Sequence, residues 1–392
     1  MTSPITDSAH LQTLIASEFP QQAGLCYLNH AAVSPWPQRA ATALAAFAQE
    51  NVVTGAFHYP RWLQIQKTLR ERLARLVGAT TTEEIALVKN TSEGLSLVAF
   101  GLDWREGDEI IISNQEFPSN RVVWQALESR FGVIVKQVDL ASASTPELAL
   151  LGAVNGRTRL LSISSVQYGS GLQVNTHTLG TTLRAKGVLF CVDAIQSLGA
   201  RAFSVQEDCI DFLVADGHKW MMGPEGLGVF YIRQALIPQL KLHQYGWHML
   251  AQRGNYDIAD NTPATNATRF ECGSPNLLGI VTLEQSLALL EAIGFDQIEA
   301  RLHYNINYLK SILDTIPQVS ILSDLSEGRS LGILTFSWDG IPSASLWQRL
   351  MKAEVVCASR GGGVRFSPHF YTSHNTLDIA CNRLISCVSE IN

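Results

Sequence analysis

The sequence has few charged residues, and they carry no excess of positive charge. Charged side chains make up 16% of the 392 residues, and the formal net charge is −6. A surface of this kind has no general attraction for the phosphates of nucleic acids or for anionic lipid headgroups. We therefore expect neither a nucleic acid nor a membrane surface as a partner.

The sequence also lacks the segments that direct a chain into a membrane or out of the cell. No run of eighteen uninterrupted apolar residues occurs, and residues 1–8 do not combine a basic stretch with an apolar one. The seven cysteines are an odd number and include no Cys-x-x-Cys pair, so we expect neither a disulfide framework nor a zinc site. These absences favour a cytoplasmic protein with reduced thiols and no bound metal.

Between residues 85 and 232 the sequence does show a regular pattern, in which short β-rich runs alternate with helical or irregular stretches. Several runs are apolar throughout, as strands covered on both faces are. The alternation predicts an α/β domain with a mostly parallel sheet, whose ligands bind beyond the carboxyl ends of the strands. The seven predicted strands are Ile85–Val88, Glu109–Ile112, Val133–Val135, Arg159–Ile163, Val188–Val192, Phe212–Ala215 and Gly228–Ile232.

Helical patterns lie on both sides of this region. Apolar residues recur at helical spacing from Trp62 to Leu76, which predicts an amphipathic helix packed on the core. The apolar stretch Leu277–Ile293 predicts a long helix that could bridge two lobes. Further on, helices alternate with strands, the first of them Leu331–Phe336, which predicts a small α+β domain. The expected division is a helical segment at 1–24, a large domain at 25–290 and a small C-terminal domain at 291–392.

Two polar residues follow predicted strands. Lys219 lies among Trp220, methionines and glycines rather than among other charges, which predicts a partly buried amine. Burial lowers the pKa of a lysine and makes its neutral, nucleophilic form accessible for Schiff-base chemistry. Asp193 directly follows the strand Val188–Val192, so its carboxylate is expected in the same crevice. Taken alone, Asp193 also fits a helix N-cap or a metal ligand, and Lys219 a solvated surface charge.

A third polar element is Asn90-Thr91-Ser92-Glu93-Gly94, between the strand Ile85–Val88 and a helical run. Backbone N–H groups and hydroxyls at a helix N-terminus form an anion-binding site. The same letters also fit a capping box, in which a Ser or Thr and a following Glu satisfy the first backbone groups of the helix. Both interpretations can hold at once.

Together these segments resemble a known enzyme family. Asp193-Ala-Ile-Gln196, Gly217-His218-Lys219-Trp220 and Thr91-Ser92-Glu93-Gly94 are similar to motifs of the class V aminotransferase family, which includes cysteine desulfurases, kynureninases and isopenicillin-N-epimerase-like proteins. The resemblance covers nearly the whole chain and implies fold type I of the pyridoxal-phosphate-dependent transferases. Further matching segments, in chain order, are Tyr27–Ala32, Glu116–Asn120, Arg269–Pro275 and Arg365–Tyr371.

The resemblance implies that the cofactor is pyridoxal 5′-phosphate and assigns roles around its ring. Lys219 would form the internal aldimine and then move protons at the α-carbon of the substrate. Asp193 would keep the ring nitrogen protonated, and Gln196 would bind the phenolic oxygen. His30 and Arg365 would bind the substrate, the arginine through a bidentate contact to its carboxylate. For Arg365 the alternative is a surface ion pair.

The same resemblance assigns the phosphate contacts. Thr91, Ser92 and His218 would hold the phosphate of their own subunit. Ser274 would reach the phosphate of the neighbouring subunit, which implies a homodimer with shared active sites. Asp216 stands where the family often has serine or threonine; because a carboxylate would repel the phosphate, we expect it to point elsewhere.

Several positions depart from the desulfurase pattern. Phe117 stands where desulfurases carry a histidine on the cofactor ring; it can stack there but cannot act as an acid or base, and ordinary core packing is its alternative. Tyr168 stands near a position where desulfurases have asparagine. The interval from Arg360 to Arg365 holds no cysteine. Cys357 precedes it in an apolar run that predicts a structural thiol, which leaves Cys272 as the other candidate.

These observations favour an enzyme that acts on a small amino acid through Lys219, by aminotransferase or C–S lyase chemistry. A cysteine desulfurase that uses a cysteine away from the usual loop, or an amino-acid epimerase, is the alternative within the same family. A catalytically idle protein that keeps the fold for binding or regulation is the alternative of another class. The joint presence of Lys219, Asp193, Gln196 and Arg365 argues against that last interpretation.

Overall fold

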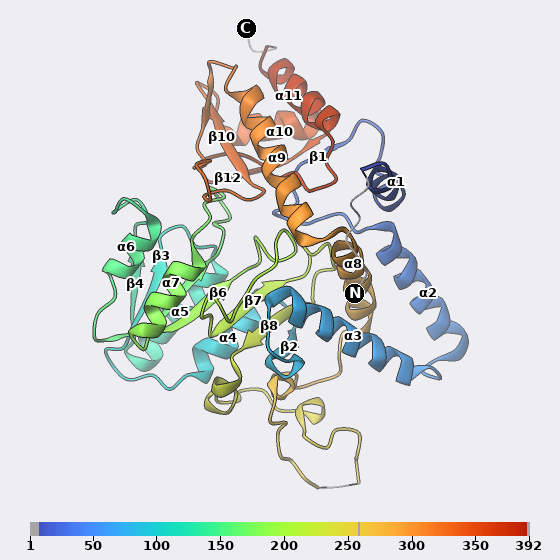
Figure 1. Cartoon of the computed structure of the whole chain (residues 1–392), viewed down its shortest axis with the longest axis vertical. Coiled ribbons are helices and arrows are strands. Elements are labelled where there is room, and N and C mark those ends of the chain that lie inside the picture. The colour runs from blue at the N-terminus through green and yellow to red at the C-terminus, as the bar shows by residue number, and fades with distance from the viewer. Residues whose placement is uncertain (1–7, 258, 390–392) are drawn as a thin grey trace.

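A seven-stranded sheet forms the centre of the molecule, which the computed structural model describes over residues 8–257 and 259–389 (Figure 1). Its strands are β2 (Ile85–Val88), β3 (Glu109–Ser113), β4 (Ile134–Val138), β5 (Thr158–Ser164), β6 (Leu189–Asp193), β7 (Phe212–Asp216) and β8 (Gly228–Ile232). They lie in the order β2-β8-β7-β6-β5-β3-β4. Strand β8 is antiparallel to both of its neighbours and the other pairs are parallel. The prediction of a mostly parallel seven-stranded sheet is therefore confirmed.

Helices cover both faces of this sheet because successive strand residues point to opposite sides. In β7, Leu213 and Ala215 belong to one hydrophobic core, and Phe212 and Val214 belong to the other. The first core is closed by α3 (Tyr59–Val77), α6 (Pro146–Gly152), α7 (Thr176–Ala185) and α8 (Leu277–Ile293). The second is closed by α4 (Thr91–Gly101) and α5 (Ser119–Phe131). The predicted helices from Trp62 to Leu76 and at Leu277–Ile293 are thus confirmed.

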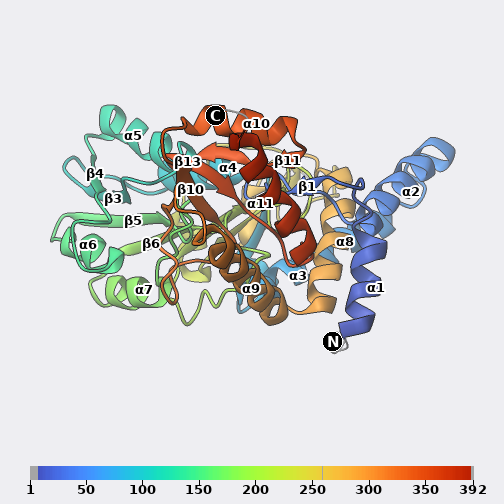
Figure 2. The same cartoon turned by 90° about the horizontal axis from the view of Figure 1, so that it is seen from above.

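A smaller sheet lies over the carboxyl-terminal edge of the large one (Figure 2). Its antiparallel strands are β9 (Val319–Ile321), β10 (Leu334–Trp338), β12 (Ala358–Arg360) and β13 (Gly363–Phe366), in the order β12-β13-β10-β9. The helices beside it are α9 (Phe295–Leu313), α10 (Ser343–Lys352) and α11 (His374–Ser389). Strand β10 begins later than the predicted Leu331–Phe336, because Leu331 and Ile333 pack as loop residues into the first core of the large sheet.

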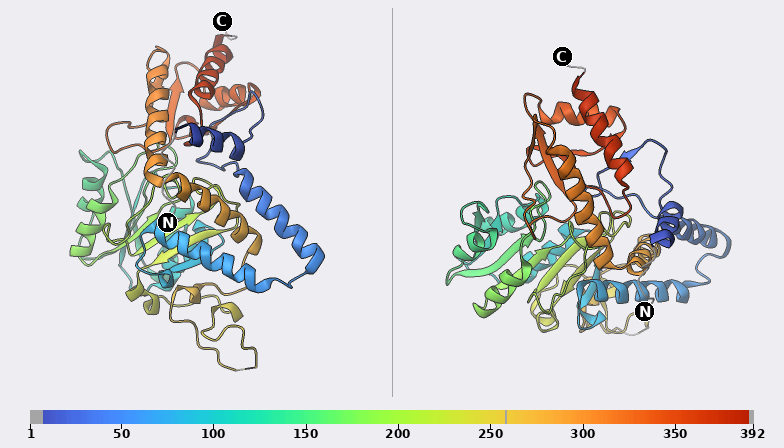
Figure 3. Two further views of the ribbon diagram at one scale, coloured as in Figure 1. Left: turned by 45° about the vertical axis from the view of Figure 1, so that its right-hand side comes forward. Right: turned by 45° about the horizontal axis from the view of Figure 1, so that its top comes forward.

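The N-terminal part of the chain contacts both layers. Helices α1 (Ser8–Glu18) and α2 (Gln38–Thr54) precede α3, and α2 extends away from the sheet beside α3 and α8 (Figure 3). Between α1 and α2, strand β1 (Cys26–Tyr27) pairs in parallel with β11 (Val355–Val356) of the C-terminal layer. This pairing carries residues 28–33 across the gap between the layers.

Helices α8 and α9 join the two layers through Gly294, where the chain bends by 82°. Gly294 has φ of 95°, a conformation that residues with a side chain rarely adopt. A division of the chain near residue 290 stays a prediction. In the described ranges no single helix is long and apolar enough to span a membrane, and α8 with α9 passes that test of length and composition only as a bent pair.

Candidate active site

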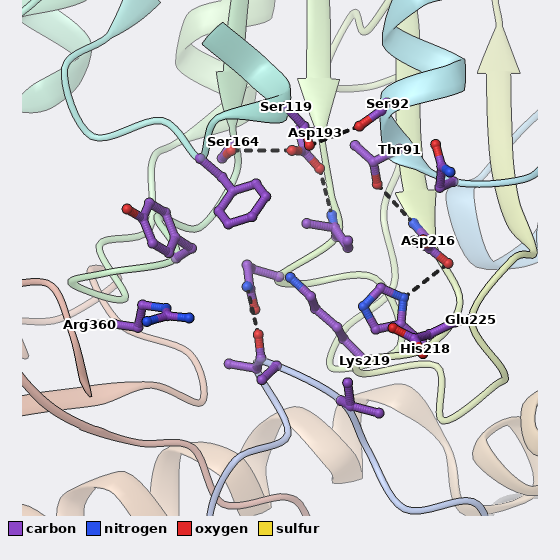
Figure 4. A pocket seen from close by; sticks show the side chains of 18 of the residues that line it. Thr91, Ser92, Ser119, Ser164, Asp193, Asp216, His218, Lys219, Glu225 and Arg360 are labelled. Carbon is purple, nitrogen blue, oxygen red and sulfur yellow. Dashed lines mark hydrogen bonds and ion pairs between the residues drawn. The ribbon is translucent and has the colours of Figure 1, made fainter. Parts of the chain in front are cut away.

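A cavity of about 330 Å³ lies where strands β6 and β7 end (Figure 4). Residues of four further parts of the chain also line it: the start of α4, the segment before α5, strands β12 and β13, and residues 31–33. Parallel strands of such a sheet end at the same edge, so polar residues distant in sequence meet there. Except for His30 and Ser274, the residues predicted from sequence all line this cavity: Lys219, Thr91, Ser92, Phe117, Tyr168, Asp193, Gln196, His218 and Arg365.

Lys219 lies in a tight turn after β7. The backbone N–H of Met222 donates to the Lys219 carbonyl oxygen at 3.0 Å, and that of Gly223 donates to the Gly217 carbonyl oxygen at 2.8 Å. Burial lowers the pKa of the Lys219 amine to about 8; Arg365 lowers it further, and Asp193 raises it. A much larger fraction of this amine is therefore neutral near pH 7 than of an ordinary lysine, as a nucleophile or base requires.

Asp193 ends β6 and faces the same space. Its Oδ1 accepts a hydrogen bond from the backbone N–H of Ile195 at 3.0 Å, and Ser164 Oγ lies 3.5 Å from Oδ2. Burial raises the pKa of the Asp193 carboxyl to about 7, and the carboxylate of Glu116 raises it further, whereas Lys219 lowers it. Asp193 is thus a more basic carboxylate than usual, suited to hold a proton on a cationic partner.

Glu116 is a buried carboxylate behind Asp193 that the sequence did not single out. Burial raises its pKa. Its oxygens accept hydrogen bonds of 2.5 to 3.1 Å from Ser113, Asn120, Ser164 and Gln167. The Ser164 hydroxyl is 2.5 Å from Glu116 and 3.5 Å from Asp193, so its hydrogen bond to Asp193 is the weaker of the two. The segment Glu116–Asn120 was recognised as a motif, but its glutamate carried no signal of its own.

The amide of Gln196 has a fixed orientation. Its Nε2 donates to the Ala31 carbonyl oxygen at 3.0 Å, and its Oε1 accepts from the indole Nε1 of Trp220 at 3.1 Å. A carbonyl oxygen only accepts and an indole N–H only donates, so the amide cannot be reversed. The second hydrogen on Nε2 remains for an acceptor in the cavity. Trp220 is fully buried and positions Gln196 in this way.

The start of α4 lies at one end of the cavity, the end suited to an anion. Asn90 caps the helix by accepting a hydrogen bond from the Glu93 N–H at 2.9 Å, so the helix start is capped, but by Asn90 and not by the serine or threonine of the predicted capping box. The first N–H groups of a helix have no partner within it and form the positive end of its dipole. The hydroxyl of Ser92 bonds to that of Ser119 at 2.9 Å, and both residues line the cavity.

Asp216 lies at this same end, which corrects the expectation that it points elsewhere. It is the last residue of β7 and lines the cavity together with His218. Its Oδ1 lies 3.1 Å from Nδ1 of His218, at ion-pair distance. The prediction took into account the repulsion between a carboxylate and an anion, but not the imidazole of His218 two residues away.

Arg365 on β13 is buried but has no ion-pair partner within the described residues. Its Nη1 donates to the Tyr168 carbonyl oxygen at 2.7 Å, Nη2 lies 3.5 Å from Oδ1 of Asn29, and Nε has no partner. Burial lowers the pKa of the guanidinium to about 10, and the nearby Arg360 lowers it further. A buried cation left unpaired in this way is arranged to receive an anion, and a surface ion pair is not its role.

The hairpin between β12 and β13 is closed by Gly361 and Gly362 alone. Their φ angles are 60° and 80°, and a Cβ atom added to Gly361 would lie 2.4 Å from the Gly169 carbonyl oxygen. The turn is therefore short, requires glycine and packs directly against the loop that carries Tyr168. Arg360 projects from its start into the cavity (Figure 4).

Two aromatic rings form one wall of the cavity. Phe117 is 42% exposed, so core packing is not its role. Its ring meets that of Tyr168 edge to face, with centroids 5.1 Å apart. The Lys219 amine is 5.8 Å from the Phe117 ring centroid. This wall offers a flat apolar surface beside the amine.

Two predicted site residues lie outside this cavity. His30 is fully buried; its Nδ1 donates to the Ser367 carbonyl oxygen at 2.8 Å, and its Nε2 accepts from the Tyr371 hydroxyl at 2.7 Å. Burial lowers the His30 pKa to about 4, so the ring is neutral. Ser274 lines a second cavity of about 290 Å³, together with Lys89 and Cys272.

Known proteins share both the sequence and the fold. The model of the aminotransferase class-V family matches residues 26–378. A cysteine desulfurase of Pectobacterium carotovorum is 31% identical over 83% of this chain and 80% of its own, and one of Escherichia coli is 30% identical over 80% and 78%.

Solved structures of lower identity show the same fold. The cysteine desulfurase CsdA of Escherichia coli superposes with a TM-score of 0.87 at 22% identity, covering 98% of this chain and 99% of its own. The cystine C–S lyase C-DES, solved with its product cysteine persulfide, gives 0.86 at 23% identity, covering 94% and 99%. A C-DES variant was solved with glycine covalently linked to its PLP cofactor. By its family match and its sequence relatives, this chain belongs to the aminotransferase class-V family and is an enzyme similar to cysteine desulfurases.

Proposed function

We propose that this protein is a pyridoxal-phosphate-dependent enzyme that removes the α-proton of a small amino acid and completes a C–S lyase or aminotransferase reaction. The proposal is based on two buried groups of opposite function at one cavity, a base and a cation. The cavity joins a buried amine, Lys219, whose pKa is lowered to about 8, to a buried guanidinium, Arg365, that has no acidic partner among the residues the structure describes. A base and a carboxylate receptor at the same cavity are what α-proton removal from an amino acid requires.

The residues of the cavity fit the cofactor. Pyridoxal phosphate has an anionic group, a flat ring, a basic ring nitrogen and a phenolic oxygen. The start of α4 and His218 suit the anionic group, and Phe117 offers the flat surface. Asp193 suits the ring nitrogen, and Gln196 has an N–H left for the phenolic oxygen. When bound, the cofactor supplies a ring that accepts the electron pair left at the α-carbon.

The protein residues would then control protons and orientation. The Lys219 amine takes the α-proton and can return it at another carbon. Asp193 holds a proton on the ring nitrogen, since its raised pKa makes it a strong acceptor. Arg365 binds the substrate carboxylate and so fixes which bond at the α-carbon faces Lys219.

The closed hairpin favours an outcome without an enzyme-bound persulfide. The turn at Gly361 and Gly362 has no cysteine and no length to extend into the cavity. Burial raises the pKa of the Cys357 thiol to about 12, so this nearby cysteine is a poor nucleophile. Among the relatives, C-DES is named a cystine C–S lyase. Sulfur would therefore leave this enzyme as part of a free product.

We also propose that the enzyme works as a cytoplasmic homodimer. The second cavity, which holds Ser274, combines a lysine with the N-terminal side of α4 and the Arg269–Pro275 motif. A partner subunit placed there would bring Ser274 toward its own phosphate site. The dispersed, odd number of cysteines fits a reducing compartment.

An amino-acid panel tests the reaction. The protein loaded with pyridoxal phosphate is incubated with cysteine, cystine and other small amino acids, and pyruvate, sulfide, persulfide and alanine are measured. We expect pyruvate with free sulfide or persulfide from a sulfur amino acid, or transfer of the amino group to an added keto acid. The same products should form in a Cys272→Ala, Cys357→Ala double variant. Alanine and a protein-bound persulfide would show a desulfurase, α-proton exchange alone an epimerase, and no turnover an idle protein.

A further inference from the structure

The anion-binding end of the cavity contains a buried carboxylate. Asp216 is 7% exposed, and its Oδ1 lies 3.1 Å from Nδ1 of His218. Among residues 8–257 and 259–389, neither of these two atoms makes a hydrogen bond, so the two side chains face each other at ion-pair distance but not in hydrogen-bond geometry. Glu225 adds a second carboxylate to the same cavity wall. A carboxylate here weakens the binding of an anion unless it acts through another residue.

The backbone holds this pair rigidly. The Asp216 N–H donates to Oγ1 of Thr91 at 3.1 Å, which ties the end of β7 to the start of α4. The Gly217 N–H donates to the Leu227 carbonyl oxygen at 2.9 Å, and a Cβ atom on Gly217 would lie 2.8 Å from that oxygen. The turn from Asp216 to His218 is therefore constrained, and the short distance between the two side chains follows from it.

We propose that Asp216 is a positioning residue that orients His218 and holds it as a charged hydrogen-bond donor for the cofactor phosphate. This inference rests on the proposed function, because it concerns the phosphate of pyridoxal phosphate. In Figure 4 the imidazole lies between Asp216 and Lys219, with one nitrogen facing the carboxylate. The ring then presents its other nitrogen to the cavity.

The chemistry of imidazole gives the reason. A neutral ring that carries its proton on Nδ1, the nitrogen facing Asp216, has a lone pair on Nε2, which repels an anion. Only the doubly protonated ring donates on both sides, and the carboxylate stabilises that form by the attraction of opposite charges. The same contact brings a compensating charge close to the buried Asp216, whose charge is otherwise costly.

Asparagine at position 216 separates this role from simple repulsion, because the two predict opposite signs. If Asp216 only repels the phosphate, Asp216→Asn tightens anion binding. If Asp216 acts through His218, the same substitution weakens binding, since a neutral amide no longer favours the charged ring. In a His218→Gln background Asp216 can no longer act through His218. There Asp216→Asn should tighten the binding of the anion, because only the repulsion is removed.

The test uses apo-protein and calorimetric titration with inorganic phosphate and with pyridoxine 5′-phosphate, which has no aldehyde to react with Lys219. We expect Asp216→Asn to weaken both ligands about 10-fold, the size of one charge-assisted hydrogen bond, and to leave pyridoxine, which has no phosphate, unchanged. Equal or tighter phosphate binding by Asp216→Asn would overturn the inference. Failure of the wild type to bind pyridoxine 5′-phosphate would contradict the proposed function instead, while inorganic phosphate still tests the pair.

A second measurement covers the case in which Asp216→Asn does not fold. In wild-type protein saturated with inorganic phosphate, ¹⁵N NMR of the His218 ring should show both nitrogens protonated. A neutral ring in that complex would overturn the inference. The Asp216→Ser variant, with the residue type common in the family, provides a further binding measurement and should also lose the charged donor.

Discussion

Two buried arginines in this protein, Arg70 and Arg365, differ in the partners that their guanidinium groups contact. Arg70 donates to both carboxylate oxygens of Glu271 at 2.6 and 3.1 Å, and Glu271 also accepts the Leu87 N–H at 2.9 Å. Arg365 is more deeply buried, 2% exposed against 9%, but among the described residues it meets only a carbonyl oxygen and, at 3.5 Å, an amide oxygen, and its Nε has no hydrogen-bond partner there. The Arg70 pair joins α3 to the segment after the large sheet, whereas Arg365 faces the cavity.

The difference separates structural charges from functional ones. Removing one partner of a buried pair leaves the other uncompensated, which is strongly destabilising. A buried charge without a partner already lowers stability, and a fold keeps it where a ligand completes it. Lys219 and Arg365 are of this second kind, and Arg70 and Glu271 are of the first.

The largest effect is expected at Lys219. Lys219→Ala should reduce product formation by about 10³-fold or more, because it removes both the nucleophile and the base. Its stability to urea should stay equal or rise, since a buried amine is lost. The exposed Lys67, 69% accessible in its side chain, provides the control: Lys67→Ala should leave turnover unchanged. Near wild-type turnover in the Lys219→Ala variant would show that Lys219 is not a functional charge.

Parallel substitutions of Arg70 and Arg365 test the difference between a structural and a functional arginine. Arg70→Met should lower the free energy of unfolding by about 3–5 kcal/mol, because the buried Glu271 carboxylate loses its guanidinium partner. Arg365→Met should cost much less stability but reduce kcat/KM by about 100-fold, a loss typical of a charged contact to substrate. Urea unfolding and steady-state kinetics on both variants check this. Similar losses of stability in the two would mean that Arg365 is structural.

His30 is a buried side chain whose two ring nitrogens both have hydrogen-bond partners. We expect it to affect the stability of the fold. Its pKa is lowered to about 4 from 6.5 in the unfolded chain, so protons bind the unfolded state first as the pH falls. Stability is therefore fully present above pH 6.5 and declines toward pH 4, by about 2 kcal/mol at pH 5. Burial lowers the pKa of His369 as well, which adds to the same trend. Urea unfolding at pH 7.5 and pH 5 measures this, and His30→Gln should show a smaller decline; an equal decline would exclude His30 as a source.

The smallest effect concerns Glu116, a satisfied carboxylate beside an active one. Glu116→Gln should lower the pKa of Asp193, because it removes a neighbouring negative charge. ¹³C NMR titration of the Asp193 carboxyl in apo-protein measures the change. Asp103→Asn, at an exposed site whose side chain is 71% accessible, should leave that pKa unaltered. An unmoved Asp193 pKa in Glu116→Gln would show that the two carboxylates act independently.

The sequence was sufficient for the sheet and for most of the cavity. Buried strands appear as short apolar runs, and the polar residues that follow them, Asp193 and Lys219, meet because parallel strands end at one edge. The family motifs then identified Gln196, His218 and Arg365 as members of the same site. Strand ends moved by a few residues, because pairing with neighbours decides where a strand stops.

Contacts between distant segments were not predictable in this way. The sequence does not show that Gly361 packs on Gly169, that Glu116 lies behind Asp193, or that Trp220 fixes Gln196. Asp216 was expected to point elsewhere because only its charge could be considered, and the direction of the His218 ring depends on the turn between them. Each of these depends on side-chain geometry rather than on residue type.

We propose that Lys219 is the buried amine that receives the cofactor. Purified protein is mixed with an equal amount of pyridoxal phosphate, reduced with borohydride, digested and analysed by mass spectrometry. We expect one modified peptide, the one that contains Lys219, and no modified peptide from the Lys219→Ala variant. An unmodified Lys219, or modification spread over exposed lysines such as Lys67 and Lys89, would contradict it.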